Sequence, residues 1–274
     1  MRPRLFCIPA RRAPIVAVLR RGPSAWSHLG RWDLRRQVYE PGAWIRGNLY
    51  PQRCDLSPDG QWFTYLTLKG AARWRAGQTY VAISRLPWLT ALAAWATCGT
   101  WTRGIHFVED LDVWQVEPPD EGDAGPGRRH FGVVITRPAS YAVERRRGWT
   151  ESPDSPTRKA GDMWDEARAS ELKMEKPRPG GDGTRLVVQG PFAAFRESHP
   201  GPVRYQIVER DRALSLDGVQ WADWDAKGRL LVATTGGRLQ IRRASAKHSE
   251  VIWEIDVSDL DPDPRPAPAE AHHW

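Results

Sequence analysis

Residues 54–68 read CDLSPDGQWFTYLTL. Pro58 fixes its own φ, Gly60 accepts a positive φ without steric cost, and the side chains of Asp55 and Ser57 can hydrogen-bond nearby backbone amides. The apolar and aromatic residues that follow are typical of a strand. The stretch therefore predicts a tight turn that leads into a β-strand. A calcium loop is the alternative reading, but it requires alternating acids over about 12 positions ending in Glu, and these are absent.

The same pattern recurs in the second half of the chain. Residues 222–241 read ADWDAKGRLLVATTGGRLQI, in which Asp223 and Gly228 match Asp55 and Gly60. The two glycines are separated by four periods of about 42 residues, a length within the range of a four-stranded propeller blade. One clear further copy and two weaker ones contain Gly183, Gly104 and Gly148. These spacings predict about five degenerate blades.

The motif LSPDGQWFTYLTLK resembles the turn and strand of WD40 and TolB-like β-propeller repeats, and WDAKGRLLVAT and GGDGTRLVVQG resemble weaker versions of it. The resemblance implies an all-β, propeller-like fold of about five blades of antiparallel strands. It covers only these turn and strand segments, so it implies nothing about activity.

Short segments rich in β-branched and aromatic residues, bounded by Gly, Pro or Asp, are the predicted strands. They span residues 14–21, 60–69, 78–86, 104–116, 130–137, 140–146, 184–190, 203–210, 228–235, 237–243 and 250–257. Helical propensity occurs in two places, residues 86–99 and 161–176. The second of these predicts a short helical insertion.

The predicted domain organisation is one propeller-like domain over residues 1–258, with residues 150–183 as an insertion or linker within it. Residues 259–274 are Pro-rich with little to bury, which predicts a disordered tail. If the blades close into a ring, the strand Ile15 to Arg20 is expected to pair within the sheet formed by the C-terminal strands.

The chain of 274 residues carries a formal net charge of +7, with 15 tryptophans and three cysteines. The arginine runs are spread over the whole length, at 11–12, 20–21, 35–36, 128–129 and 145–147, so the charge by itself predicts only a weak attraction to polyanions. The isolated cysteines favour a reduced intracellular chain. No signal peptide or membrane-spanning run is recognised, and we expect a cytoplasmic protein without a membrane partner.

Signatures of known catalytic and cofactor sites are absent from the sequence. There is no GxSxG nucleophile turn, no phosphate-binding glycine loop and no cysteine or histidine spacing of the kind that binds zinc. We therefore expect neither a cofactor nor a metal, and a non-enzymatic role is favoured.

Residues 106–112, HFVEDLD, concentrate one histidine and three acids. Along a strand, His106, Asp110 and Asp112 would share one face, where two carboxylates could act as general acid and base. This is the catalytic alternative. The other reading is a solvated strand face.

An N-terminal stretch interleaves arginine with aromatic residues, a combination that can stack on bases, on sugars or on a partner's side chains. The predicted partner-binding residues are Arg20, Arg21, Trp26, His28, Trp32 and Trp44. In the alternative reading, the tryptophan side chains pack between neighbouring blades, and the arginine side chains lie over them.

Three function hypotheses follow. The favoured one is a non-catalytic interaction module, a propeller scaffold that binds a protein partner. The first alternative is a propeller hydrolase acting on glycans through clustered carboxylates. The second is nucleic-acid binding through the Arg/Trp-rich surface, with affinity that falls steeply with salt.

Overall fold

The two matching turns of the sequence have the same structure. Gly60 and Gly228 have φ of 75° and 71°. The amide of Gly60 donates to the carbonyl oxygen of Ser57 at 2.9 Å, and that of Gly228 to Asp225 at 3.0 Å. Ser57 Oγ accepts from the amide of Trp62, and Asp225 Oδ1 accepts from the amide of Arg229. The predicted turn-and-strand unit is confirmed, and Asp59 serves the turn, since its Oδ1 accepts from the amide of Gln61 at 3.0 Å.

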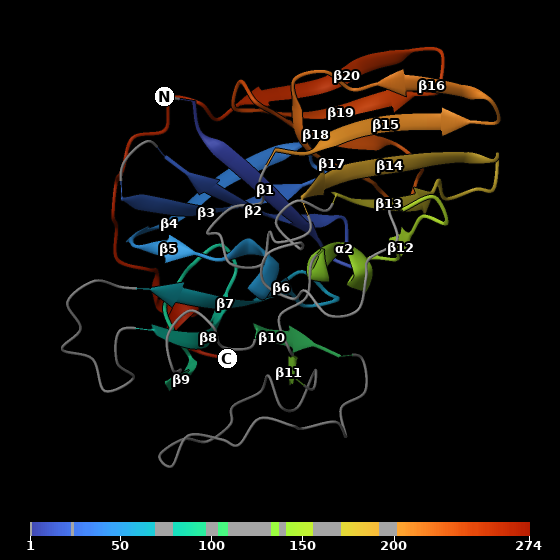
Figure 1. Cartoon of the computed structure of the whole chain (residues 1–274). Coiled ribbons are helices and arrows are strands. Elements are labelled where there is room, and N and C mark those ends of the chain that lie inside the picture. The colour runs from blue at the N-terminus through green and yellow to red at the C-terminus, as the bar shows by residue number, and fades with distance from the viewer. Residues whose placement is uncertain are drawn as a thin grey trace.

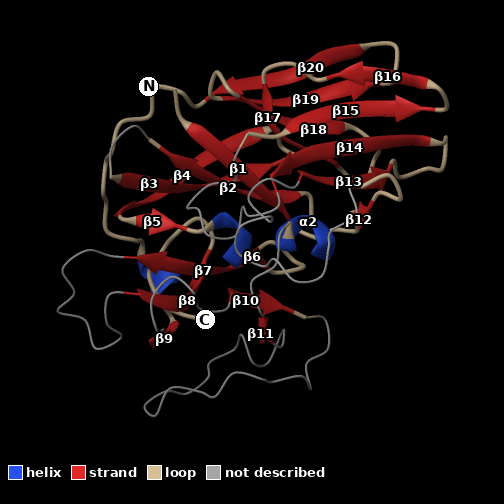
Figure 2. Cartoon of the chain, viewed as in Figure 1, coloured by secondary structure: helices blue, strands red, loops and turns tan. Residues whose placement is uncertain are grey.

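The computed structural model describes residues 2–22, 25–68, 79–96, 104–108, 133–136, 141–155, 171–191 and 202–274. Strands make up most of the regular structure in this part of the chain (Figure 2). They form five antiparallel sheets, each built from strands that are close in sequence. The all-β, propeller-like prediction is confirmed.

Sheets 1 and 5 come from the two ends of the chain, and each has four strands in sequence order. Sheet 1 contains β1 (Arg4–Pro9), β2 (Ile15–Arg21), β3 (Trp26–Asp33) and β4 (Val38–Arg46). Sheet 5 contains β17 (Val219–Trp224), β18 (Leu230–Thr234), β19 (Arg238–Ala244) and β20 (Ser249–Asp256).

Sheets 2, 3 and 4 come from the middle of the chain. Sheet 2 contains β5 (Asn48–Leu49), β6 (Asp55–Leu56), β7 (Trp62–Leu68), β8 (Thr79–Arg85) and β9 (Ala93–Ala96). Sheet 3 pairs β10 (Gly104–Phe107) with β11 (Val133–Thr136). Sheet 4 contains β12 (Thr150–Glu151), β13 (Glu171–Pro177), β14 (Thr184–Pro191), β15 (Arg204–Glu209) and β16 (Arg212–Ser215).

The sheets pack face to face, with sheet 1 between sheets 4 and 5 on one side and sheets 2 and 3 on the other (Figure 1). In sheet 5, the strand β18 begins with a continuous apolar run, Leu230 to Ala233. Leu231 joins the core shared with sheets 1 and 2, whereas Leu230 and Val232 join the core shared with sheet 4. Because successive side chains of a strand point to opposite faces, a strand buried on both faces needs a continuous apolar run.

The first and last sheets meet without exchanging a strand. β2 pairs with β1 and β3 of its own sheet, so the expectation that Ile15 to Arg20 would complete the C-terminal sheet is wrong. The strand β1, which the sequence did not predict, is an edge strand of sheet 1. It packs against β17 and β18 of sheet 5. Trp32 and Trp253 stack across this junction with ring centroids 5.5 Å apart.

The helical predictions are corrected by the structure. Residues 140–146 were expected to form a strand, but Ala142–Arg146 form the helix α2. Part of the predicted helix 86–99 is strand β9, and residues 171–176 of the predicted helical insertion belong to β13. Residues 161–170 lie outside the described residues. A helix needs an apolar stripe to bury, and pairing with neighbouring strands overrides weak propensity.

Contacts to sheet 2 hold α2 in place. Gln52, in the 3₁₀ turn η1 (Pro51–Arg53), donates to both oxygens of Glu144, at 3.0 and 3.2 Å. Its own oxygen accepts from the amide of Val143 at 3.1 Å. Burial raises the pKa of Glu144, and the bonds from Gln52 oppose that rise. The helix is thereby anchored beside the turn that carries Asp55.

Two further segments differ from expectation. The ends of the predicted insertion or linker 150–183 are strands of sheet 4 and its first hairpin turn. The C-terminal segment 259–274, expected to be disordered, has a defined course that includes the 3₁₀ turn η4 (Ala269–His272). Trp274 packs 5.5 Å from the ring of Trp62, and Arg85 donates to the carbonyl of Glu270 at 3.1 Å. One aromatic ring and backbone carbonyls therefore anchor a segment poor in apolar residues.

None of the helices in the described part of the chain has the length and apolar character needed to cross a membrane.

Candidate anion-binding pocket

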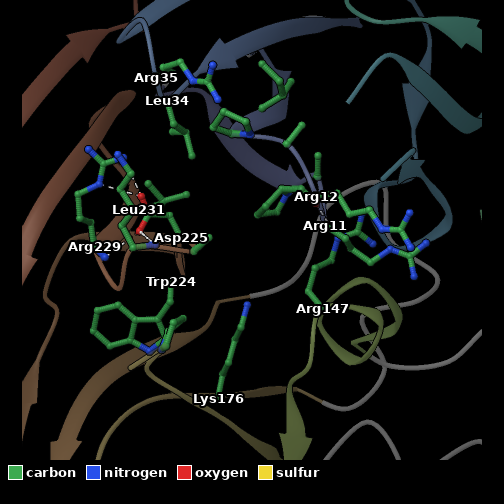
Figure 3. Close-up of a pocket in the computed structure, with 18 of the residues that line it drawn as sticks. Arg11, Arg12, Leu34, Arg35, Arg147, Lys176, Trp224, Asp225, Arg229 and Leu231 are labelled. Atoms are coloured by element: carbon green, nitrogen blue, oxygen red, sulfur yellow. Dashed lines mark hydrogen bonds and ion pairs between the residues drawn. The ribbon is translucent and has the colours of Figure 1, made fainter. Parts of the chain in front are cut away.

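A cavity of about 480 Å³ lies between sheets 1, 4 and 5 and the end of α2. Among the described residues, its wall carries eight cationic side chains: Arg11, Arg12, Arg35, Arg146, Arg147, Lys176, Lys227 and Arg229. Asp225 is the one carboxylate that lines it in this part of the chain. Figure 3 shows the labelled side chains surrounding an open space, with Arg11, Arg12 and Arg147 facing Arg229 across it. We refer to this cavity as the basic pocket.

Short turns present the cations of sheet 1. The β1–β2 turn is tied to sheet 2 because the amide of Arg12 donates to the carbonyl of Pro58 at 2.9 Å. In the β3–β4 turn, Oδ1 of Asp33 accepts from the amides of Arg35 and Arg36, at 3.0 and 2.9 Å. This is the turn chemistry expected of an aspartate, and it leaves the Arg35 side chain at the pocket mouth.

The deep wall is held by a buried ion-pair cluster. Nη1 of Arg147 lies 2.6 Å from Oδ1 of Asp55, and Nε of Arg146 lies 3.6 Å from Oδ2. Arg147 also donates to the carbonyls of Pro9 and Leu56, at 3.0 and 3.3 Å. Burial alone would raise the pKa of Asp55, but Arg147 and Arg146 lower it to about 2. Asp55 therefore stays ionised and fixes both guanidinium groups.

The equivalent aspartate of sheet 5 holds another cation. Nζ of Lys176, on β13, lies 2.6 Å from Oδ1 of Asp223. The same oxygen accepts from the amide of Trp224 at 2.7 Å, just as Asp55 Oδ1 accepts from the amide of Leu56 at 2.9 Å. The two matched aspartates thus each receive a cation from a segment outside their own sheet.

The lining carboxylate Asp225 is already engaged. Its Oδ2 lies 2.8 Å from Nε and 2.7 Å from Nη2 of Arg229, while its Oδ1 accepts from the amides of the turn. Among the described residues, counting Asp55, Asp223 and Asp225 against the seven cations other than Arg12 leaves an excess of four positive charges around the pocket. Such a wall favours a multiply charged anion.

The pocket mouth carries exposed cations. Arg35 and Lys227 are exposed, and no carboxylate of the described residues lies within ion-pair distance of either side chain. Arg11 is exposed as well and donates to the carbonyl of Phe107 at 3.0 Å. Below them, the buried Trp224 carries Arg178 over its ring at 5.5 Å, and its indole N–H has no acceptor in the described part of the chain. The wall is therefore rich in donors.

The structure describes one of the three predicted catalytic residues. His106, on β10, is 2% exposed, and its Nδ1 has no hydrogen-bond partner among the described residues. Burial, with a smaller contribution from Arg146, lowers the pKa of His106 to about 3. Asp110 and Asp112 lie outside the described residues. His106 is thus a neutral, buried side chain behind the Asp55 cluster.

The predicted partner-binding residues are not gathered on one exposed surface. Trp32 and His28 are both 0% exposed. Arg20 is buried and donates to the carbonyls of Val257 and Ser258, at 3.0 and 2.6 Å. Its guanidinium also lies 5.5 Å from the ring of Trp44. Much of this cluster packs sheet 1 and holds the chain's own C-terminal segment.

The remaining two residues of that prediction are half-buried. Arg21 bonds to the carbonyl of Gly47 at 3.3 Å and to the side chain of Asn48. Trp26 lies at the start of β3. The alternative reading, in which tryptophan and arginine seal and cover the junctions between sheets, accounts for most of the six residues.

No cluster of three or more histidine, cysteine, aspartate or glutamate side chains suited to a metal is found in the described ranges. The basic pocket was not predicted as a site. Its sequence signal was the arginine runs at 11–12, 35–36 and 145–147, each of which contributes at least one lining residue.

Comparison with protein-family models finds no match, and no curated protein matches. Among solved structures, the chain is similar to the β-propeller domain of the trilobed protease from Pyrococcus furiosus, which has an open velcro topology. The identity is 10%, the TM-score is 0.32, and the match covers 92% of this chain and 86% of that one. An uncharacterised protein of Listeria monocytogenes EGD-e matches with 9% identity and a TM-score of 0.30, covering 94% and 85% of the two chains. Because both TM-scores are low, the propeller-like assignment rests on the sheets described above.

Proposed function

We propose that the protein is a non-catalytic interaction module that binds a protein partner by receiving an acidic segment of it in the basic pocket. The observation that carries this proposal is the excess of four positive charges, Arg12 left aside, among the described residues around a bounded cavity of about 480 Å³. A partly enclosed wall strengthens the attraction between charges relative to open water and speeds the encounter with an anionic segment.

The glycan-hydrolase alternative is less well supported by this geometry. General acid and base catalysis needs two carboxylates that reach the substrate, one of them with a raised pKa. The lining carboxylate Asp225 is paired with Arg229. Asp55 has a pKa lowered to about 2 and is buried behind Arg147. Asp225 is engaged in an ion pair and Asp55 stays ionised near neutral pH, so these two side chains do not supply the acid and base that the reaction needs.

A nucleic-acid ligand also fits less well. Single strands are bound along an extended basic groove with exposed aromatic rings on which successive bases stack. Here the cations surround one bounded cavity, and its tryptophan, Trp224, is 3% exposed. An acidic polypeptide needs only a cluster of cations with room for a few side chains.

The test uses the full chain and two short fluorescent peptides, one Glu-rich and one in which every Glu is Gln. We expect the Glu peptide to bind at least about tenfold more tightly by fluorescence anisotropy, a difference of about 1.4 kcal/mol. The double variant Arg35→Gln, Lys227→Gln should remove most of that preference. Arg243→Gln is the matched control, since Arg243 is exposed and does not line the pocket.

Equal binding of the two peptides, or a preference that survives the double variant, would contradict the proposal. A single-stranded oligonucleotide that displaces the Glu peptide and binds more tightly than it does would assign the pocket to nucleic acid instead.

A further inference from the structure

We infer that the group received by the basic pocket is a phosphate monoester carried on a side chain of the partner segment. This inference rests on the proposed function and narrows it from acidic segments in general to phosphorylated ones. Its grounds are the directions from which the cations approach, the size of the charge excess and the dominance of arginine.

The cations approach the cavity from separate segments. Arg11 and Arg12 come from the β1–β2 turn and Arg35 from the β3–β4 turn, while Arg146 and Arg147 end α2. The remaining lining cations, from sheets 4 and 5, are Lys176, Lys227 and Arg229. Figure 3 shows labelled members of these groups on different sides of the space. A tetrahedral phosphate can accept from several such directions, whereas a carboxylate accepts through two oxygens in one plane.

The charge excess also favours phosphate. One carboxylate carries a single negative charge, but a phosphorylated side chain carries about −1.5 to −2 at pH 7 and three strong acceptor oxygens. Among the described residues, the seven lining cations other than Arg12 exceed the three carboxylates paired with them by four positive charges. A phosphate therefore offsets more of that excess from a single attachment point.

The identity of the cations points the same way. Six of the eight are arginines. The planar guanidinium presents its donors in a fixed fork that matches phosphate oxygens two at a time. The exposed Arg11 is oriented by the bond that its Nη2 donates to the carbonyl of Phe107, at 3.0 Å. Orientation before binding lowers the entropy lost when the ligand arrives.

The volume is consistent with a side chain rather than a bare ion. A cavity of about 480 Å³ falls within the size range of small-ligand sites, about 300 to 1,000 Å³, and exceeds the space one phosphate needs. The exposed lining cations Arg35 and Lys227 would reach the phosphate, and the remaining space would take the chain that carries it. The phosphate should therefore be recognised together with the chain that carries it.

The test compares three fluorescent peptides of one neutral sequence that differ at a single central residue: serine, glutamate or phosphoserine. With the full chain, the phosphoserine peptide should bind at least about tenfold more tightly than the glutamate peptide, as expected for the stronger charge-assisted bonds of phosphate. The double variant Arg35→Gln, Lys227→Gln should abolish the difference, and Arg243→Gln should leave it unchanged. Circular dichroism checks that both variants remain folded.

Each of the other outcomes contradicts the phosphate inference, and together they show whether the acidic-segment function also fails. If the glutamate and phosphoserine peptides bind equally and both exceed the serine peptide, the phosphate inference is overturned while the acidic-segment function stands. If neither exceeds the serine peptide, both proposals fail. If inorganic phosphate alone displaces the phosphoserine peptide at a concentration equal to the peptide's own dissociation constant, the site binds free phosphate and the inference is overturned.

Discussion

The carboxylate of Asp55 lies 2.6 Å from the guanidinium of Arg147, which joins the first hairpin turn of sheet 2 to the residue that follows α2. Both side chains are almost fully buried, at 1% and 3% exposure. The same carboxylate accepts from the amide of Phe107 in sheet 3 at 3.0 Å. One aspartate thus connects two sheets and a helix, and it orients a cation that lines the basic pocket.

Asp55→Asn is expected to destabilise the protein by about 3 to 5 kcal/mol, because it leaves Arg146 and Arg147 buried without a counter-charge. Asparagine keeps the size of the side chain, so the loss reports the charge. Urea unfolding followed by tryptophan fluorescence measures it. Asp211→Asn, at an exposed turn position, is the control and should change the free energy of unfolding by less than about 0.5 kcal/mol. A small effect of Asp55→Asn would show that the ion pair does not support the fold.

Acid should destabilise the protein well above the pH at which carboxylates protonate. Burial lowers the pKa of His28 to about 4 and that of His106 to about 3, from an ordinary value of 6.5. Below pH 6.5 the unfolded chain takes up protons that the folded chain does not, so stability falls as pH falls. The slope reaches about 1.4 kcal/mol per pH unit for each histidine. Asp55, with its lowered pKa, adds a further loss only below about pH 4.

This pH dependence can be assigned to single residues. His28→Gln and His106→Gln should each remove about half of the slope between pH 6.5 and 4.5, because one proton-uptake step is lost. Unfolding free energies measured across that range in urea provide the readout. His248→Gln, at an exposed imidazole, is the control. A slope that neither buried substitution changes would contradict the assignment.

Alanine substitutions at two glycines distinguish the cost of backbone strain from the cost of steric crowding. Gly60 and Gly148 both have positive φ, 75° and 82°. A Cβ on Gly60 would lie 2.7 Å from Cβ of Ile15, whereas one on Gly148 meets nothing within 4 Å. Each substitution to alanine should cost about 1 to 2 kcal/mol for the left-handed conformation. Gly60→Ala should cost a further 1 to 3 kcal/mol or so for overpacking. Thermal unfolding compares them, and equal losses would contradict this account.

The features that the sequence predicted correctly are local ones. The turns at Gly60 and Gly228 depend on residues within a few positions, and the apolar residues of β7 and β18 are numerous because both faces of each strand are buried. The missed elements depend on distant contacts. The strand β1 forms because it pairs with β2, and that pairing could not be recognised from the residues of β1 alone. The helix α2 is held by Gln52, which lies far away in sequence in the turn η1.

The candidate site could not be read from the sequence for the same reason. The arginine runs at 11–12, 35–36 and 145–147 were recognised as dispersed charge, and only the fold brings them to one cavity. Conversely, Arg20 and Trp44 are neighbours in space as the N-terminal pattern suggested, but the segment they contact belongs to the same chain. A spacing pattern shows that side chains can bind a polypeptide, and it does not show which one.

The contact between Arg20 and the C-terminal segment can be tested by substitution. Arg20 donates to the carbonyls of Val257 and Ser258, at 3.0 and 2.6 Å, and the negative charges of Asp261 and Asp259 lie close enough to favour its charged form. Hydrogen bonds from a charged donor contribute about 1.5 to 3 kcal/mol each. Arg20→Gln should therefore lower the free energy of local opening of residues 257–274 by about 2 kcal/mol or more, which accelerates amide exchange roughly 30-fold.

Hydrogen exchange followed by mass spectrometry measures this effect on the peptides that cover 257–274. Arg265→Gln is the matched control, because Arg265 lies in the same segment and pairs only with Asp263 on the exposed surface. An exposed pair of this kind contributes about 0 to 1 kcal/mol, so exchange in the control should stay near that of the unaltered protein. If both variants accelerate exchange equally, or neither does, Arg20 is not the residue that fixes the segment against sheet 1.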